Sequence, residues 1–298
     1  MKTAIVTGSD SKYFHYLLNL CESLKKTNTL QKVTLCILSI DLDEYQIKLL
    51  SKYSSNIKTP KWDFKFNFKA DNWKKLLTAR PFLKDYFPKF KNYIWLDADT
   101  NVLNNNFVDV FNSSLDYYEM SIAPEDDKSY LNFKLNKTFK NIFFDYFKVQ
   151  GWSYKNNSKF FSKKYASKLI NKPIFNAGVF SIKSSSFIWN LWKKYYRDII
   201  NKSKTQYCLN MDQASLNKII YENINNINIL NVKYNWLIKN KLPFLDKNNN
   251  LYSTNFPFEK IEILHFTQID INKKKRFLNP CKKKYKKYSF AKILNINS

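Results

Sequence analysis

The chain has 298 residues, of which 44% are hydrophobic and 17% are aromatic. This apolar content is enough for a sizeable core and excludes a chain that is disordered throughout. The formal net charge of +26 predicts attraction to phosphate groups, whether these belong to nucleic acid, to anionic lipid or to a small diphosphate.

The N-terminal part of the chain alternates short apolar runs with helical patterns. Residues 3–7 predict a buried strand, and residues 13–26 carry apolar side chains at helical spacing. A second strand and a second helix are predicted at 33–39 and 43–53. This alternation predicts βαβ units, and therefore an α/β fold with a mostly parallel central sheet flanked by helices.

The rest of the chain continues the same alternation. Residues 72–87 predict a helix that Pro81 interrupts, and the stretch 125–172 predicts short helices and a variable loop. The other expected strands are 92–96, 117–123, 174–182, 227–232 and 261–266, and the other expected helices are 185–202 and 211–222. Since no internal repeat or linker is visible, we expect one domain over residues 1–270, followed by a basic aromatic C-terminal tail over 271–298.

The C-terminal tail mixes cations with apolar side chains. Its basic residues include Lys273, Lys274, Lys275, Arg276, Lys282, Lys283, Lys284, Lys286 and Lys287, and its apolar residues include Phe277, Leu278, Tyr285, Tyr288, Phe290, Ile293 and Leu294. Such a segment suits an anionic membrane surface, where each cation contributes about 1 kcal/mol. The alternative is a charge run that is simply solvated.

The compartment follows from what the sequence lacks. The apolar run near Met1 is too short for a secretory signal, and no apolar stretch approaches the roughly 18 residues of a membrane helix. The four cysteines Cys21, Cys36, Cys208 and Cys281 have no C-x-x-C spacing, which is typical of free thiols in a reducing compartment. We therefore expect a cytoplasmic protein, in solution or peripheral at a membrane.

Two aspartates follow the predicted strand at 92–96. Asp97 and Asp99 are two residues apart, so in an extended chain both carboxylates point to the same side. Ligands of open α/β sheets bind at the carboxyl ends of the strands, and paired carboxylates near a diphosphate suit magnesium or manganese. The pattern alone is weak, since a strand-end turn with capping or solvated aspartates looks the same.

The context of these aspartates is more specific. The segment KNYIWLDADTNV at 91–102 resembles the D-x-D segment of GT-A fold glycosyltransferases, and most of all that of glycosyltransferase family 8. Further similar segments occur in the family's order: VTGSDSKY at 6–13, TAR at 78–80, FNAGV at 175–179 and NMDQASLN at 210–217. The resemblance covers roughly residues 3–270 and implies a GT-A, Rossmann-like nucleotide-binding domain.

On the donor side, the resemblance implies that Thr7, Asp10 and Tyr13 bind the base and ribose of a UDP-sugar, with Tyr13 stacking on the uracil. It also implies that Arg80 contacts the donor, and a guanidinium suits phosphate or sugar oxygens. From the residues alone, Tyr13 is as well explained as a core aromatic at a helix start. Arg80 is likewise explained by a surface ion pair.

On the sugar side, the resemblance implies that Asn176 and Asp212 bind the transferred sugar and that Gln213 lies near the anomeric carbon. It also implies that Gly178 allows the backbone to approach closely. Asp212 has a plain alternative as the N-cap of an amphipathic helix. No Asp or Glu beside Gln213 stands out as a nucleophile, which fits approach of the acceptor on the same face as the leaving group.

The metal site implied by the resemblance consists of Asp97, Asp99 and His265, with Asp97 also contacting the donor. His265 follows the apolar run at 261–264, where a structural role is the alternative. A histidine among oxygen ligands favours manganese, with magnesium as the other choice. The other histidine, His15, is expected to have no chemical role.

These observations predict a retaining, metal-assisted hexosyltransferase that moves sugar from UDP to a hydroxyl of a glycan or lipid-linked acceptor. A catalytically silent protein that binds sugar nucleotides or glycans is the alternative. It stays open because the family's Gly and Lys-Pro-Trp after the late histidine are absent after His265, where Lys273, Lys274 or Lys275 could supply charge instead.

No zinc-finger spacing or RNP-type motif predicts specific nucleic-acid binding. The donor sugar, the acceptor, the linkage and the oligomeric state are not encoded in any recognisable motif.

Overall fold

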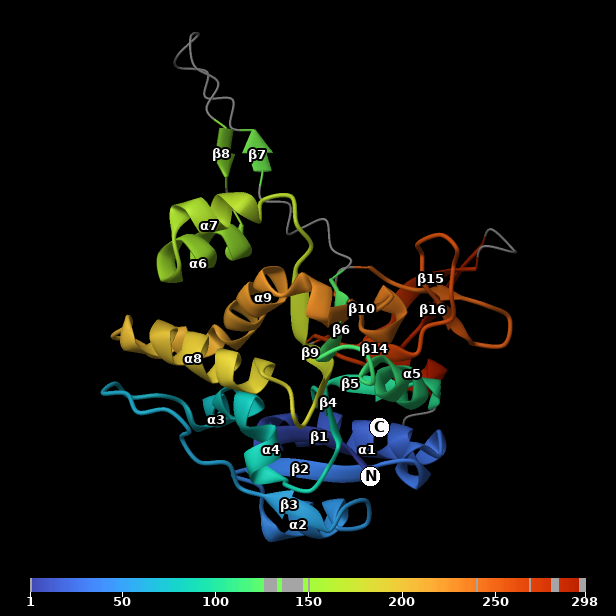
Figure 1. Cartoon of the computed structure of the whole chain (residues 1–298). Helices are drawn as coiled ribbons and strands as arrows, with labels where there is room; N and C mark the ends of the chain where they lie inside the picture. Colours follow the sequence, from blue (N-terminus) through green and yellow to red (C-terminus); the bar gives the residue numbers. More distant parts are fainter. Residues whose placement is uncertain are drawn as a thin grey trace.

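The computed structural model describes residues 2–125, 133–135, 147–149, 151–239, 241–267, 269–279 and 284–294. Its centre is a seven-stranded sheet in the order β10-β6-β9-β4-β1-β2-β3 (Figure 1). These strands are β1 (Thr3–Asp10), β2 (Thr34–Ile40), β3 (Asn56–Lys58), β4 (Asn92–Leu96), β6 (Met120–Pro124), β9 (Phe175–Lys183) and β10 (Ile227–Ile229). The pairs β1–β2, β1–β4, β2–β3 and β6–β10 are parallel. Only β9 runs the other way within this sheet, antiparallel to β4 and β6.

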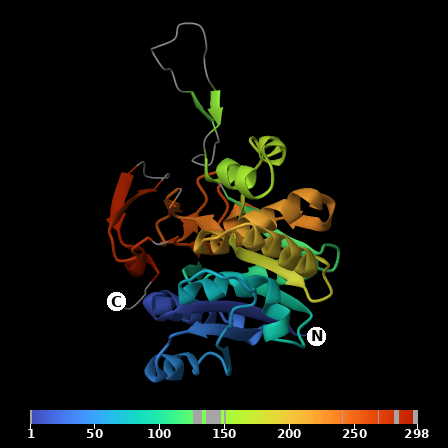
Figure 2. The ribbon, with the colours of Figure 1, turned by 90° about the vertical axis from the view of Figure 1, so that its left-hand side faces the viewer.

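Helices cover both faces of this sheet (Figures 1 and 2). The helices of the described residues are α1 (Phe14–Lys26), α2 (Glu44–Leu50), α3 (Lys75–Ala79), α4 (Leu83–Tyr86), α5 (Asn106–Ser114), α6 (Trp152–Phe160), α7 (Lys163–Lys168), α8 (Ile188–Asn201), α9 (Asp212–Glu222) and α10 (Phe290–Ile293), of which α6, α7 and α10 lie away from the sheet. Alternate residues of β1 enter two different cores. Val6 packs with Trp192 of α8, whereas Ile5 packs with Leu17 of α1. The strands are therefore apolar on both faces, as parallel strands between helical layers are.

The predicted architecture is confirmed: the fold is α/β, with a mostly parallel central sheet between helices. Pro81 interrupts the helical pattern as expected, since the chain passes from α3 into a 3-10 turn at Arg80–Phe82 and then into α4. This break places Arg80 between two short helices with its side chain buried. The predicted short helices within 125–172 are α6 and α7, which pack on each other beyond α9.

A smaller sheet completes the architecture beside the large one. Its strands are β11 (Trp236–Leu237), β14 (Ile263–His265) and β5 (Thr100–Val102), in the order β11-β14-β5. Three further two-stranded pieces are β7 (Phe133–Leu135) with β8 (Phe147–Val149), β12 (Phe244–Leu245) with β13 (Leu251–Tyr252), and β15 (Lys275–Asn279) with β16 (Lys284–Tyr288). The sequence patterns did not predict these short strands, apart from β14.

The segment after residue 270 folds back onto the domain. In β15 and α10, Phe277 and Phe290 are 1% and 0% exposed, and they pack in one cluster with Phe266. The ring of Phe290 lies 5.6 Å from that of Phe266. Contacts therefore cross the predicted boundary at residue 270, and the division of the chain there stays a prediction. Cys281, Lys282 and Lys283 lie outside the described residues.

Two expectations, about unpaired cysteines and about membrane helices, can be compared with the structure. Cys21, Cys36 and Cys208 are buried free thiols, in line with the expectation of unpaired cysteines. Within the described part of the chain, every helix is too short or too polar to span a bilayer.

Candidate functional site

The site lies at one edge of the central sheet, where several strand ends meet. β1 ends at Asp10 and β4 at Leu96, so Asp97 follows at the same edge as Asp10. Because β9 is antiparallel, it begins at this edge, and the Gly178 carbonyl accepts a 2.8 Å hydrogen bond from the Asp97 N–H. The carboxyl ends of parallel strands are where open α/β sheets bind ligands. The structure thus brings the segments that contain Asp10, Asp97 and Gly178 to one edge of the sheet.

Asp97, Asp99 and His265 form a compact group. One ligand atom from each lies within 4.8 Å of the others, so one ion could contact all three. His265 is brought here because β14 pairs with β5, which places His265 opposite Thr100, next to Asp99 in the chain. The Nε2 atom of His265 lies 3.2 Å from Asp99 Oδ1 and 3.7 Å from Asp97 Oδ2. Two carboxylates and an imidazole are a donor set that suits manganese or magnesium.

The charge of this group also favours a cation. Burial lowers the pKa of His265, but the carboxylates of Asp99 and Asp97 raise it more, so the pKa lies above its ordinary value. The same negative field that stabilises a protonated imidazole stabilises a divalent cation. The residues present therefore fit a metal ion.

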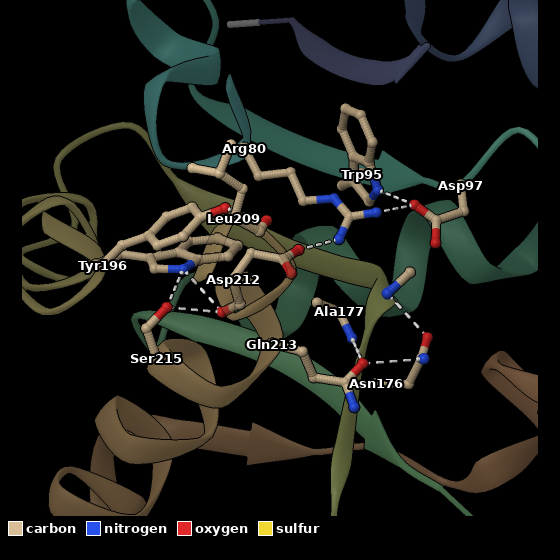
Figure 3. A network of polar contacts seen from close by, with 12 residues as sticks. Arg80, Trp95, Asp97, Asn176, Ala177, Tyr196, Leu209, Asp212, Gln213 and Ser215 are labelled. Atoms are coloured by element: carbon tan, nitrogen blue, oxygen red, sulfur yellow. Dashed lines mark hydrogen bonds and ion pairs between the residues drawn. The ribbon is translucent and has the colours of Figure 1, made fainter. Parts of the chain in front are cut away.

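Arg80 is held between two acids (Figure 3). Its guanidinium donates through Nη1 to Asp212 Oδ2 and through Nη2 to Asp97 Oδ1, and it lies over the ring of Trp95, 5.0 Å from its centroid. Trp95 Nε1 donates to the same Asp97 oxygen at 2.6 Å. Arg80 thus orients one predicted metal ligand and one predicted sugar-binding acid together. It is 7% exposed, so the ion pair is not at the surface.

A second set of polar contacts starts from β9 (Figure 3). The Asn176 Nδ2 and the Ala177 N–H both donate to Gln213 Oε1, at 3.2 and 3.3 Å. Gln213 Nε2 in turn donates to Glu125 Oε1 at 3.1 Å. Asp212 and Gln213 begin α9, but Asp212 is not its N-cap, because that position is Met211. The capping alternative for Asp212 is therefore wrong.

Gly178 is packed directly against the group of Asp97, Asp99 and His265, called the metal group below. A Cβ at this position would lie 2.3 Å from His265 Cε1, 2.6 Å from Asp97 Oδ2 and 2.7 Å from Asn176 Oδ1. Such contacts are far closer than packed atoms tolerate. Only glycine therefore lets β9 pass so close to these side chains.

Gly178→Ala is expected to lower Mn²⁺ affinity, because the methyl group displaces His265 or Asp97. The loss should be at least roughly 10–100-fold, which is the loss caused by removing a hydrogen-bond partner of a metal ligand. Calorimetric titration with Mn²⁺ measures this. Ser181→Ala, on the same strand, is the control, since it removes a buried hydroxyl away from the metal group. Equal affinity in Gly178→Ala and wild type would contradict the assignment.

Two cavities flank the network. The β1-side cavity, of about 340 Å³, is lined by Asp10, Tyr13, Trp73, Arg80, Asp97 and Asp99 among others. The α9-side cavity, of about 370 Å³, is lined by Trp73, Glu125, Trp152, Asn176, Asp212 and Gln213 among others. Both volumes are in the range of small-molecule sites. The polar network lies between them, so each cavity has access to part of it.

Most of the predicted residues are brought together, with two differences. Thr7 is 0% exposed and is not among the residues that line the β1-side cavity. Lys273, Lys274 and Lys275, all described, do not line either cavity, whereas Lys12 lines the β1-side one. Asp10 accepts a 3.0 Å hydrogen bond from the Tyr13 N–H, which turns the chain at the cavity mouth. Lys12 was not among the predicted site residues.

Four other site residues were also missed. They are Trp73, Glu125, Trp152 and Asn235. Glu125 supplies a carboxylate next to Gln213, where no Asp or Glu had stood out in the sequence. It directly follows β6, and Asn235 directly precedes β11, so their positions relative to strand ends were the available signal. Neither lies in a recognisable motif.

Comparison with solved structures shows the same fold in glycosyltransferases. A galactosyltransferase, LgtC, in complex with donor and acceptor sugar analogues has a TM-score of 0.53 at 14% identity, covering 89% of this chain and 87% of that one. Mouse xyloside xylosyltransferase 1 has a TM-score of 0.55 at 13% identity, covering 90% and 98%. At such identity the likeness shows the fold alone. Among curated proteins, none matches the sequence at a significant level.

The family follows from the sequence itself. The profile of glycosyl transferase family 8 matches residues 4–273, nearly the whole chain, and this range includes each motif that meets at the site. The resemblance seen in the motifs is thereby confirmed. The chain belongs to glycosyl transferase family 8 and is a glycosyltransferase of the GT-A fold.

Proposed function

We propose that the protein is a retaining glycosyltransferase that moves a hexose from a UDP-sugar to a hydroxyl of a glycan or lipid-linked acceptor, assisted by Mn²⁺ or Mg²⁺. The observation that carries this proposal is the group formed by Asp97, Asp99 and His265, which adjoins the network of Arg80, Asp212 and Gln213. A cation held there supplies positive charge against the charge that develops on the leaving nucleoside diphosphate.

The β1-side cavity suits the nucleotide. Asp10 and Tyr13 line its wall, and the Tyr13 ring offers a face for a base to stack on. Lys12 adds a cation that a diphosphate would pair with, whereas Lys273, Lys274 and Lys275, the alternatives named from the sequence, do not line this cavity. Thr7 lies beneath this wall and stays a prediction for base or ribose binding. Arg80 and Asp97 stand at the boundary with the sugar side.

The α9-side cavity suits the transferred sugar and the acceptor. Asn176 and Asp212 present polar groups to it, and Trp73 and Trp152 present aromatic surface. An aromatic side chain combined with hydrogen-bonding groups suits a sugar, which has both apolar faces and hydroxyls. Trp73 lines both cavities, so it stands where donor and acceptor would meet.

The hydrogen bonds of Gln213 favour a retaining mechanism in which the acceptor approaches on the same face as the leaving group. Its Oε1 already accepts two hydrogen bonds, which occupies both lone pairs of a carbonyl oxygen. Glu125 Oε1 accepts from Gln213 Nε2, and Asp212 is paired with Arg80. The occupied amide oxygen argues against an attack by Gln213 on the anomeric carbon.

A donor screen tests the proposal. UDP release is measured with Mn²⁺ for UDP-glucose, UDP-galactose and their N-acetyl forms. We expect turnover of at least one donor, lost when Mn²⁺ is chelated. Calorimetric binding of UDP without hydrolysis or transfer of any donor would instead support a catalytically silent sugar-nucleotide-binding protein.

The anionic membrane surface remains a proposed partner, with a changed basis. The tail's Phe277 and Phe290 belong to the core, so the proposal now rests on the exposed cations among the described tail residues. Arg276 of β15 lies directly opposite Lys287 of β16, and both are exposed. Like charges opposite each other destabilise a strand pair, and an anionic surface would relieve that repulsion. Truncation after residue 270 would disrupt the core and is no test of this.

Charge removal is the suitable test. The combined replacement of Lys273, Lys274, Arg276 and Lys287 by Gln is expected to weaken binding to phosphatidylserine vesicles by roughly 100-fold or more, since each cation contributes about 1 kcal/mol. Vesicle sedimentation measures this.

The control makes the same change of charge elsewhere, by replacing Lys48 of α2, Lys52 just after it, and Lys163 and Lys164 of α7, which are also exposed, by Gln. Equal loss in both variants would show that net charge, and not this surface, governs the attraction.

A further inference from the structure

The amide of Asn235 joins the metal group to the sugar side of the site. Asn235 is 1% exposed. Its Oδ1 lies 2.9 Å from His265 Nδ1, and its Nδ2 lies 3.2 Å from Asn176 Oδ1. We propose that Asn235 is a positioning residue that fixes the ring of His265 for metal binding at one end and the amide of Asn176 for sugar binding at the other. This rests on the proposed function, because it requires a cation at Asp97, Asp99 and His265.

The direction of these hydrogen bonds is set by the backbone. An amide side chain can be turned end for end without changing its shape, so its polarity has to be deduced from its partners. The Gly178 N–H can only donate, and it donates to Asn176 Oδ1 at 2.8 Å. Asn176 therefore presents its oxygen to Asn235, which must meet it with Nδ2. The Oδ1 of Asn235 then faces His265.

The consequence for His265 follows directly. An amide oxygen cannot donate, so the Nδ1 atom of His265 carries the proton and donates it to Asn235. The Nε2 atom is then the one that faces Asp97 and Asp99 and can bind a cation. His265 is 3% exposed, so bulk water has little access to replace this partner. Such outer partners orient metal-bound histidines and raise their affinity for the ion.

The same chain of bonds continues on the sugar side. Asn176 Nδ2 donates to Gln213 Oε1, which also accepts from the Ala177 N–H. That second backbone donor fixes the polarity of Gln213, whose Nε2 then donates to Glu125. A change at Asn235 therefore reaches two places by separate routes. It alters the metal ligand through His265, and it alters the sugar-side amides through Asn176.

Two substitutions separate these routes. Asn235→Ala removes the acceptor for His265, so we expect Mn²⁺ affinity to fall roughly 10–100-fold. Asn235→Asp keeps an acceptor for Nδ1–H and makes it a carboxylate, so Mn²⁺ affinity should equal or exceed that of the wild type. Its second oxygen, however, would face Asn176 Oδ1, which the Gly178 N–H holds in place. Affinity for UDP-sugar at saturating Mn²⁺ should therefore fall in Asn235→Asp.

The readouts are Mn²⁺ titration of the nucleotide-free protein and UDP-sugar titration of the Mn²⁺-saturated protein. Asn92→Ala is the matched control: Asn92 is 3% exposed and bonds Asn112 near the start of β4, away from the site. It should cost stability and leave Mn²⁺ affinity unchanged. Opposite responses of the Ala and Asp variants to Mn²⁺ support the proposal. Equal losses in both, or no loss in Asn235→Ala, overturn it.

The chain offers a direct spectroscopic test, because it contains only two histidines. In ¹⁵N-histidine-labelled His15→Gln protein saturated with Mg²⁺, the remaining signals belong to His265. We expect a proton bound to Nδ1 that exchanges slowly with water, and we expect fast exchange in Asn235→Ala. A proton on Nε2 in the Mg²⁺-loaded protein would overturn the proposal even if Asn235→Ala failed to fold.

Failure of the proposed function would look different. If the unsubstituted protein bound neither Mn²⁺ nor Mg²⁺, metal use itself would be wrong, and the proposal for Asn235 would fall with it. If the unsubstituted protein bound metal and turned over donor while both Asn235 variants matched it, only the role of Asn235 would be wrong.

Discussion

Protein in which both Asp97 and Asp99 are replaced by Asn should lose its Mn²⁺-dependent turnover of UDP-sugar, by roughly 10³-fold. The reason is that the two carboxylates are two of three candidate ligands, within 4.8 Å of each other and of His265. A bound metal supplies several kcal/mol of charge stabilisation in such reactions, and each 1.36 kcal/mol is about tenfold in rate. UDP release with and without Mn²⁺ measures the effect. Unchanged Mn²⁺-dependent turnover would refute the site assignment.

The two aspartates should differ when they are changed singly. Asp97 is also paired with Arg80, whereas the contact of Asp99 within the group is with His265. Both Asp99→Asn and Asp97→Asn should therefore abolish the rise in melting temperature that Mn²⁺ produces. Asp97→Asn should lower the melting temperature in chelator more than Asp99→Asn does, because it also takes one carboxylate from a buried guanidinium. Asp109→Asn, whose side chain is 66% exposed, is the control and should change neither.

The fold was predictable from the sequence where periodicity and burial agree. β4 was predicted at the residues where it occurs, because its sequence is a mostly apolar run. In the structure all five of its side chains are buried. β9 was predicted as a strand, but not as the strand that runs antiparallel between β4 and β6. Local pattern carries no information about direction. That direction matters, because it brings Asn176 and Gly178 to the edge where Asp97 lies.

The site was predictable only where motifs exist. Asp97, Asp99 and His265 were expected to meet, and they do so through the pairing of β14 with β5, although β5 was not predicted. Asn235 and Glu125 were missed because the partners of their side chains lie far away in sequence. The aromatic tail residues were misjudged for a related reason. Their pattern indicates apolar contact, but whether the partner is a membrane or Phe266 depends on the fold.

Replacing Arg80 should have the largest effect on stability. Arg80→Ala leaves Asp212 and Asp97 without the guanidinium that both contact, and Asp212 is 3% exposed. Removing one partner from a buried ion pair costs about 3–5 kcal/mol of the free energy of unfolding, since it strands a charge away from water. Turnover should also fall, by about 100-fold, because Asp97 and Asp212 lose their common orientation. Urea unfolding and UDP release measure the two effects.

The pH dependence of that loss identifies its cause. Burial raises the pKa of Asp212, and the Arg80 guanidinium opposes this rise, so removal of Arg80 raises the pKa further. An aspartate whose pKa is higher in the folded than in the unfolded state destabilises the fold as its proton is lost. The loss in free energy of unfolding of Arg80→Ala relative to wild type should therefore be smallest near pH 4, around the ordinary aspartate pKa. It should grow toward pH 7. Lys91→Ala, which breaks the exposed pair with Asp116, should cost at most about 1 kcal/mol at either pH. If the loss in free energy of unfolding of Arg80→Ala were also independent of pH, its cause would be the lost packing of Arg80 against Trp95 and not a stranded carboxylate.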